Sequence, residues 1–200
     1  MSTRTRPGPP AGSPPWPGAE LLERAVAYAR VSLALVSPGQ LTASTPCRGW
    51  DLRQLLAHLG DSLASLHEAG VGGPVALRRH PPPAGDPVAG LQPIVAGLLA
   101  GWAADPERGR RDVLVGDRPL TAPVLAAAGA LEVTVHGWDV ATACGADRPI
   151  PAALAVDLLR VAPRLVTDAD RPHRFAPPVP APAAASPGEV LLAFLGRPPR

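Results

Sequence analysis

The sequence predicts an all-α protein: a four-helix bundle with extra helices at its C-terminal end. Three observations carry this prediction. Hydrophobic residues make up 46% of the chain but aromatic residues only 4%, so the core must consist of Leu, Val and Ala, and Leu and Ala favour packed helices. Apolar side chains recur at helical spacing over long segments. The segments between them are rich in Pro and Gly, which end helices.

The chain of 200 residues fits one domain with a real hydrophobic core. We divide it into a Pro/Gly-rich tail, residues 1–17, and a helical bundle domain, residues 18–200. The tail has too little apolar surface to offset the entropy of ordering, so we expect it to be disordered. It also lacks the apolar stretch that a secretory signal needs.

The first predicted helix covers residues 19–36 and ends at the Ser-Pro-Gly sequence that follows it. A loop dense in turn-forming residues comes next. A second helix then begins near Asp51, whose carboxylate can accept hydrogen bonds from the free amides of the first turn. This helix runs to residue 70 and ends at a glycine.

A third helix is expected over residues 87–104, with Asp86 as its cap and with Pro93 kinking it or delaying its start. The polar stretch that follows contains DVLV, residues 112–115, which could pair as a short strand. The longest uninterrupted helical pattern then covers residues 122–144. Its proline lies in the first turn, where a missing amide costs little.

A fifth helix is predicted over residues 151–167, followed by a Pro-rich loop. The last helix starts at the capping-box pattern of Ser186 and Glu189, just ahead of an apolar run. We expect the first four helices, with the longer connections among them, to form the bundle.

Composition argues against several classes of partner. The formal net charge is only +2, and no long basic run interleaved with aromatic residues occurs, so nucleic acid is not an expected partner. No apolar stretch approaches the ~18 residues of a membrane span. Two cysteines do not make a disulfide framework in a domain of this size. We therefore expect a cytoplasmic protein, a monomer or homodimer, whose partners are small molecules.

The histidines point to a metal site. Glu132 and His136 lie four residues apart in the fourth helix, so their side chains share one face and can reach one ion. His58, in the second helix, lies on a mostly apolar stripe that faces the bundle. Helical bundles build metal sites from ligands on facing helices. The predicted metal ligands are therefore His58, Glu132 and His136.

The other histidines are weaker candidates. His67 lies nine residues beyond His58 and is turned from it by about 180°, so it should point out of the bundle. His80 and His173 lie in Pro-rich loops.

More ordinary interpretations stay open. A lone histidine on an apolar face, such as His58, is more often a hydrogen-bonded core residue than a metal ligand. Glu132 with His136 is equally consistent with an ion pair on a helix surface. Against the latter, Glu132 stands in a strongly apolar helix, where an unpaired buried charge costs several kcal/mol. Cys47, just before a helix start, is either a thiol activated by the helix dipole or a small packed hydrophobe. No G-x-S-x-G motif supports nucleophilic hydrolysis.

Three segments resemble a known family. LTASTPCRGWDLRQLLAHLG (41–60) and LEVTVHGWDVATACG (131–145) are similar to the signature blocks of the DinB-like metalloprotein superfamily, and more closely of the mycothiol-dependent maleylpyruvate isomerase N-terminal domain. FAPPVPAPAAASPGEVLLAFLGRPP (175–199) resembles the C-terminal end of a small subfamily from high-GC Gram-positive bacteria. The likeness covers nearly everything after the N-terminal tail.

This resemblance implies a four-helix bundle with one metal ion, usually zinc, held by three side chains. The metal-binding positions of the family fall on His58, Glu132 and His136, in agreement with the helical spacing. The chain departs from the isomerase in lacking its additional C-terminal domain, which helps to complete the thiol and substrate site. Maleylpyruvate is therefore not carried over as the substrate.

The leading functional hypothesis is a zinc-dependent enzyme that activates a low-molecular-weight thiol such as mycothiol for S-transfer or isomerisation of a small electrophile. Asp139 is interpreted as an orienter of His136 or as an acid/base, and Trp50 and Trp138 as walls of the pocket. The alternatives for these three are a surface acid and core tryptophans. A non-catalytic protein that binds metal and a small molecule, or a metal-dependent hydrolase, are the other functional hypotheses.

Overall fold

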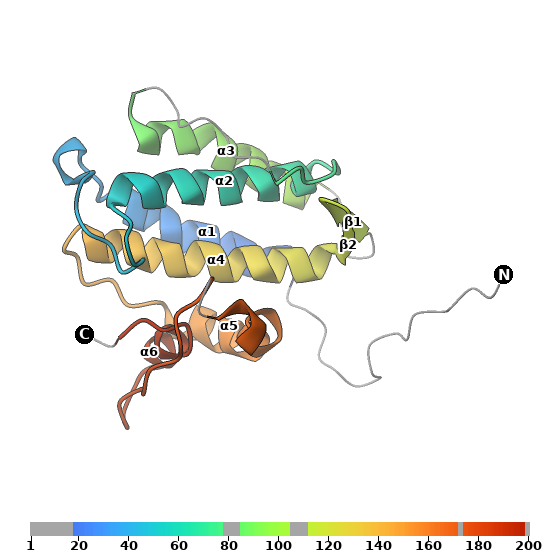
Figure 1. Cartoon of the computed structure of the whole chain (residues 1–200). Helices are drawn as coiled ribbons and strands as arrows, with labels where there is room; N and C mark the ends of the chain where they lie inside the picture. The colour runs from blue at the N-terminus through green and yellow to red at the C-terminus, as the bar shows by residue number, and fades with distance from the viewer. Residues whose placement is uncertain (1–17, 78–84, 105–111, 172–173, 199–200) are drawn as a thin grey trace.

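The computed structural model describes residues 18–77, 85–104, 112–171 and 174–198. The predicted N-terminal tail, residues 1–17, lies outside this part of the chain, and so do His80 and His173. Four long helices form a bundle, as the sequence predicted: α1 (Ala19–Leu33), α2 (Leu52–Gly70), α3 (Pro87–Ala103) and α4 (Ala122–Ala143). Helix α1 packs on α4, and α2 packs on both α3 and α4 (Figure 1).

The other elements cover the outside of this bundle. Helices α5 (Ala152–Leu165) and α6 (Pro187–Phe194) pack on each other, and α5 packs on α4 (Figure 1). Before α4, strands β1 (Asp112–Val115) and β2 (Arg118–Thr121) form an antiparallel hairpin, so the DVLV strand is confirmed. The short 3-10 turns are η1 (Pro38–Gln40) and η3 (Asp168–Asp170).

The helix starts follow the predicted capping. Asp51 accepts a hydrogen bond from the Gln54 amide at 2.8 Å, and the Gln54 side chain accepts one from the Asp51 amide at 2.9 Å. Asp86 caps α3 by accepting a hydrogen bond from the Val88 amide at 2.9 Å. Pro93 does not delay the start of α3, which is helical on both sides of it. The Asp51 cap fixes where α2 begins, and therefore the position of His58 along the bundle.

One helix crossing depends on a glycine. A Cβ atom at Gly137 of α4 would lie 3.0 Å from the Cα of Ala29 in α1, which is tighter than nine in ten real Cβ contacts. The missing side chain lets the two helices approach closely at the residue next to His136. The core around this crossing is built from Leu, Val and Ala, as the composition predicted. Among the described residues, no helix combines the length and apolar character needed to cross a membrane.

Candidate metal centre

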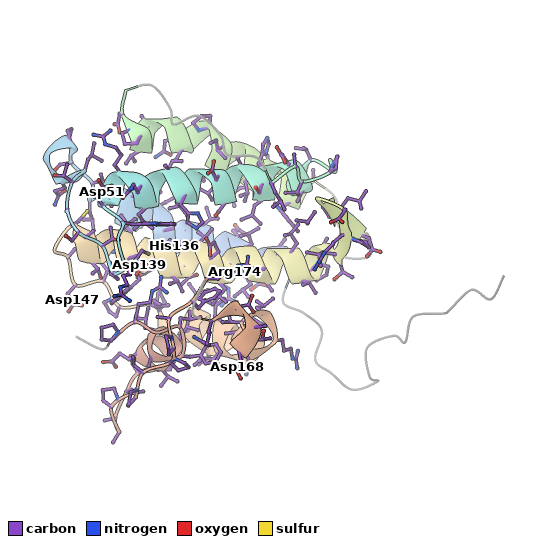
Figure 2. All side chains as sticks on the ribbon, viewed as in Figure 1. Asp51, His136, Asp139, Asp147, Asp168 and Arg174 are labelled. Carbon is purple, nitrogen blue, oxygen red and sulfur yellow. The ribbon has the colours of Figure 1, made fainter. Side chains whose placement is uncertain are left out.

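Helix α4 carries a row of three ionisable side chains. Glu132, His136 and Asp139 are spaced by four and three residues and therefore share one face. Nε2 of His136 lies 3.2 Å from Oε1 of Glu132, and Nδ1 of the same ring lies 3.0 Å from Oδ2 of Asp139. Figure 2 shows His136 and Asp139 one after the other along α4. The imidazole thus meets one carboxylate with each of its nitrogens.

Helix α2 brings His58 to the same point. Its Nε2 lies 2.7 Å from Oε1 of Glu132, and the Ser62 hydroxyl donates to that oxygen at 3.2 Å. The rings of His58 and His136 are perpendicular, with centroids 5.0 Å apart. One ligand atom from each of His58, Glu132 and His136 lies within 4.8 Å of the other two. The three residues predicted as ligands are therefore brought together.

The loop before α2 adds an aromatic ring. The Thr45 hydroxyl donates to the Trp50 carbonyl at 2.9 Å and accepts from the Cys47 amide at 3.2 Å, which closes a tight turn. Gly49 has a φ of +80°, which a glycine adopts without strain. The turn holds the Trp50 ring edge-on to His58, with centroids 4.9 Å apart. The sequence TPCRGW is thus a structural unit that delivers both a thiol and an indole to the site.

The opposite side of His136 holds two residues that the sequence analysis did not assign to the site. The Cys47 thiol lies 3.2 Å from Oδ2 of Asp139 and 3.7 Å from Nδ1 of His136. Arg197, beyond α6, donates to Asp139 from Nη2 at 2.7 Å and from Nε at 3.3 Å. The only sequence signal for Cys47 was its position before a helix start. Nothing in the sequence pattern placed Arg197 near α4.

The two sides of the His136 ring differ in exposure. We call the group of His58, Glu132 and Nε2 of His136 the open side, because the side chains of His58 and Glu132 are 38% and 28% exposed. We call the group of Asp139, Arg197, Cys47 and Nδ1 of His136 the closed side. There the side chains of Asp139 and Arg197 are only 0% and 11% exposed. The open side is therefore the side of His136 that is partly accessible to solvent.

The charges of the open side support one another. Burial raises the pKa of Glu132, but the charge and hydrogen bond of His136, together with the hydrogen bond of His58, outweigh it and hold that pKa well below its usual range. Burial lowers the pKa of His136, but the Glu132 charge and the Asp139 hydrogen bond raise it well above its ordinary value. Both shifts favour a charged pair of Glu132 carboxylate and His136 imidazolium when no ion is bound.

On the closed side, burial raises the pKa of Asp139, and the hydrogen bond from His136 and the charge of Arg197 outweigh this effect. The net result is a lowered pKa, so Asp139 is a carboxylate. An ionised carboxylate only accepts hydrogen bonds, so Nδ1 of His136 carries a proton and donates it to Asp139.

The open side fits a divalent ion. Two imidazoles and one carboxylate are a ligand set of catalytic zinc sites, with bonds of about 2.0–2.2 Å that place neighbouring ligand atoms about 3.4 Å apart. The separation of 3.2 Å between His136 and Glu132 is close to this value. The 2.7 Å between His58 and Glu132 has to widen by less than about 1 Å, which the exposed His58 ring can accommodate. Cys47, His136 and Asp139 form a second group of possible ligands.

The remaining predicted residues lie at different depths. Trp138 is buried and belongs to the hydrophobic core, and its role as a pocket wall stays a prediction. The expectation that His67 points away from the bundle is wrong. Its ring lies over Gly97 of α3, because α3 packs on that face of α2.

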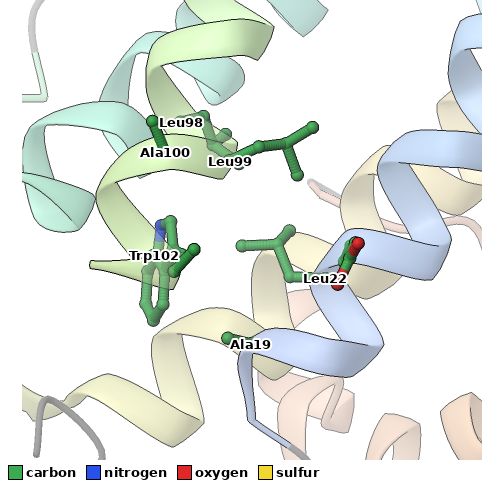
Figure 3. A pocket seen from close by; sticks show the side chains of 8 residues that line it. Ala19, Leu22, Leu98, Leu99, Ala100 and Trp102 are labelled. Carbon is green, nitrogen blue, oxygen red and sulfur yellow. The ribbon is translucent and has the colours of Figure 1, made fainter. Parts of the chain in front are cut away.

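A separate cavity of about 320 Å³ lies between α1 and α3 (Figure 3). Apart from Glu23, its lining is apolar, with Leu22, Leu98 and Trp102 among its walls. The lining contains none of the candidate ligands. The cavity is therefore separate from the candidate metal centre.

The fold and this centre together define a helical-bundle protein with a candidate metal site between two facing helices. The chain belongs to the family of the mycothiol maleylpyruvate isomerase N-terminal domain, which matches residues 22–141. The family resemblance seen in the two sequence blocks is thereby confirmed. The matched region contains the whole open side but not Arg197.

Individual relatives agree with this assignment. The uncharacterized proteins Rv0738 and MT0763, from two strains of Mycobacterium tuberculosis, are each 29% identical over 167 residues, which is 82% of this chain and 89% of theirs. A crystal structure of the mycothiol-dependent maleylpyruvate isomerase aligns with a TM-score of 0.50 and 20% identity. The alignment covers 70% of this chain but only 65% of the isomerase chain, and it shows a shared fold.

Proposed function

We propose that this chain is a divalent-metal-dependent enzyme, with zinc as its ion, that activates a low-molecular-weight thiol such as mycothiol. The activated thiol serves S-transfer to, or isomerisation of, a small electrophilic substrate. The observation that carries the proposal is the open side: three suitable ligands from two helices, accessible to solvent. The thiol is suggested by the family, whose name contains mycothiol.

The residues of the centre would divide the work. His58, Glu132 and His136 would hold the ion, and three protein ligands leave a coordination position for a substrate. A divalent ion in this position supplies Lewis acidity that keeps a bound thiol in its thiolate form. Asp139 holds the Nδ1 proton of His136, so that Nε2 presents its lone pair to the open side. Trp50 offers an apolar surface beside His58 against which a substrate can pack.

The substrate is proposed only as a chemical class. Because the chain spans less than two thirds of the isomerase chain, groups that the rest of that protein supplies have no counterpart in the aligned part. We therefore propose a small electrophile, such as an activated halide, an epoxide or a cis-unsaturated acid.

The test is thiol consumption by the purified, zinc-loaded protein, with mycothiol and a panel of such electrophiles. We expect turnover that requires both thiol and ion and that is lost in His58→Ala. Turnover should persist in the control variant Arg174→Ala, which removes an exposed arginine outside the candidate site. Binding of zinc and thiol with no turnover of any electrophile would instead indicate a binding protein. Thiol-independent cleavage of esters or amides would indicate a hydrolase. Either result overturns the proposal.

A further inference from the structure

Arg197 makes the shortest polar contact of the closed side. Its guanidinium meets both oxygens of Asp139, at 2.7 Å and 3.3 Å, and also donates to the Leu195 carbonyl at 3.1 Å. A guanidinium that binds both oxygens of a carboxylate forms a charge-assisted fork with a defined geometry. Both side chains are almost completely shielded from solvent. The fork therefore fixes the position of the Asp139 carboxylate.

The end of α6 explains why Arg197 reaches α4. The Arg197 amide donates to the Leu192 carbonyl at 2.9 Å, and the Gly196 amide donates to the Ala193 carbonyl at 3.1 Å. These two bonds are the Schellman motif, which requires a left-handed residue after the helix. Gly196 supplies it with a φ of +76°. The chain reverses there and directs the Arg197 side chain back toward Asp139.

The contact continues into the imidazole. Oδ2 of Asp139 accepts from Arg197 at 2.7 Å and also meets Nδ1 of His136 at 3.0 Å. Because the guanidinium fixes the position of the Asp139 carboxylate, its oxygen can accept the Nδ1 proton in only a narrow range of orientations of the His136 ring. The proton position on a metal-binding histidine is set by the hydrogen bond of its other nitrogen. Arg197 therefore acts on Nε2 of His136 without touching it.

We propose that Arg197 is a positioning residue of the metal centre: its fork on Asp139 fixes the Nδ1-protonated form and the orientation of His136, and thereby sets the affinity of the open side for a divalent ion. The part of this inference that concerns the ion rests on the proposed function.

The alternative use of the closed side is a second ion bound by Cys47, His136 and Asp139. Arg197 argues against it, because its Nη2 lies 2.7 Å from the Asp139 oxygen and 3.6 Å from the Cys47 sulfur. The cationic group therefore already occupies the neighbourhood of these ligands. A second ion would have to displace a buried guanidinium from its carboxylate, which leaves a buried charge unpaired.

The experiment compares zinc affinity, measured by competition with a chromophoric chelator, among the parent and four variants. Three variants carry one change each: Arg197→Lys, Arg197→Ala and Asp139→Asn. The fourth is a double variant that combines Arg197→Ala with Asp139→Asn. Arg174→Ala, which removes an exposed arginine paired with Asp170, is the matched control. We expect Arg197→Ala and Asp139→Asn each to weaken zinc binding by about 10–100-fold. Arg197→Lys should weaken it less than Arg197→Ala, because lysine keeps the positive charge. The double variant should bind no more weakly than Asp139→Asn, because both act through one contact.

A second readout needs neither ion nor activity. In the metal-free parent, nitrogen-15 NMR of the histidines should show a His136 Nδ1 proton that exchanges slowly with water, and this signal should broaden or vanish in Arg197→Lys. Zinc affinity within twofold of the parent in both Arg197 variants, or an unchanged Nδ1 proton, would overturn the inference. So would a second zinc equivalent in the parent that is lost in Cys47→Ser. If the parent binds zinc but lacks turnover, only the proposed function fails. If it binds none, the NMR signal alone decides the role of Arg197.

Discussion

The two nitrogens of His136 look onto two different environments. Nε2 faces the open side, where His58 and Glu132 are partly exposed and are joined by a single short contact. Nδ1 faces the closed side, where Asp139 is fully buried and receives donors from an arginine, a thiol and the imidazole itself. The partly exposed side chains of the open side can therefore change position. The closed side has its hydrogen-bonding positions filled by the protein.

The difference separates two tasks that a metal centre has to combine. Ligands must be free to close around an ion, and at least one of them must be held in place before the ion arrives. His58 can move because part of its ring is in solvent, whereas His136 is held by a buried carboxylate. The comparison therefore predicts that substitutions on the two sides differ in kind as well as in size.

The largest effect is expected for His136→Ala, which breaks both sides at once. Zinc binding should be lost, and the metal-free protein should lose about 1–3 kcal/mol of stability, because Glu132 and Asp139 each lose a buried partner. His58→Ala should also abolish zinc binding but leave metal-free stability almost unchanged, since its ring is partly exposed. Metal analysis and chemical denaturation of both variants test this. Unchanged metal content in both would refute the ligand assignment.

Next in size is Glu132→Gln, which keeps the shape of the open side and removes its charge. We expect zinc affinity to fall by more than the ~10–100-fold typical of a supporting residue. Because His136 and His58 hold the pKa of Glu132 low, the carboxylate stabilises the metal-free fold above its ordinary pKa. At pH 7 the variant should therefore also be less stable. An ordinary surface ion pair predicts changes within about 1 kcal/mol and no effect on zinc. Thermal unfolding with and without zinc distinguishes the two.

A smaller effect extends the closed side to Tyr28 of α1, the single tyrosine of the chain. Burial raises the pKa of Tyr28 to about 12, with the Arg148 charge lowering and the Asp139 charge raising it. Its hydroxyl donates to the Arg148 carbonyl at 2.8 Å. A raised pKa means that folding favours the neutral phenol. Its stabilisation is complete below pH about 10, the unfolded value, and is lost as pH rises through the folded value.

Absorbance of the tyrosinate should therefore show a midpoint near 12 in the folded protein. Asp139→Asn should lower that midpoint, since it removes a negative charge that opposes ionisation. Tyr28→Phe should flatten the fall in stability between pH about 10 and 12. A midpoint at about 10 would show that Tyr28 is open to solvent.

The smallest effect is expected for Cys47→Ser. Serine keeps a donor toward Asp139, and Arg197 continues to hold that carboxylate. Zinc affinity should change by less than the ~10-fold expected for loss of a supporting residue. Cys144→Ser, which alters the other free thiol, is the control. A loss of zinc binding comparable to that of His58→Ala would make Cys47 a ligand and erase the distinction between the two sides.

The sequence was informative wherever chemistry followed helical periodicity. The bundle, the caps at Asp51 and Asp86 and the grouping of His58 with Glu132 and His136 all follow from spacing along single helices. The setting of Glu132 was harder to predict. Its apolar neighbours in sequence suggested a poorly solvated carboxylate without an ion, whereas Ser62 and two histidines surround it.

The closed side could not be predicted from periodicity, because its members come from a loop and from the turn after α6. The position of the Cys47 thiol depends on the geometry of the Thr45 turn, and the position of the Arg197 side chain depends on the chain reversal at Gly196. The two contacts join residues that lie 92 and 58 positions apart in the sequence, so helical periodicity does not reveal them. The first helix ends at Leu33 and not at residue 36, since the amides of Leu35 and Val36 bond to carbonyls only three residues back.

The ring contact between Trp50 and His58 gives the molecule an optical property. The indole is 36% exposed and lies edge-on to the imidazole, with centroids 4.9 Å apart. The emission of a tryptophan depends on the groups that contact its indole ring. We therefore expect an ion or a small molecule that binds beside His58 to change the intrinsic fluorescence of the protein, without a label.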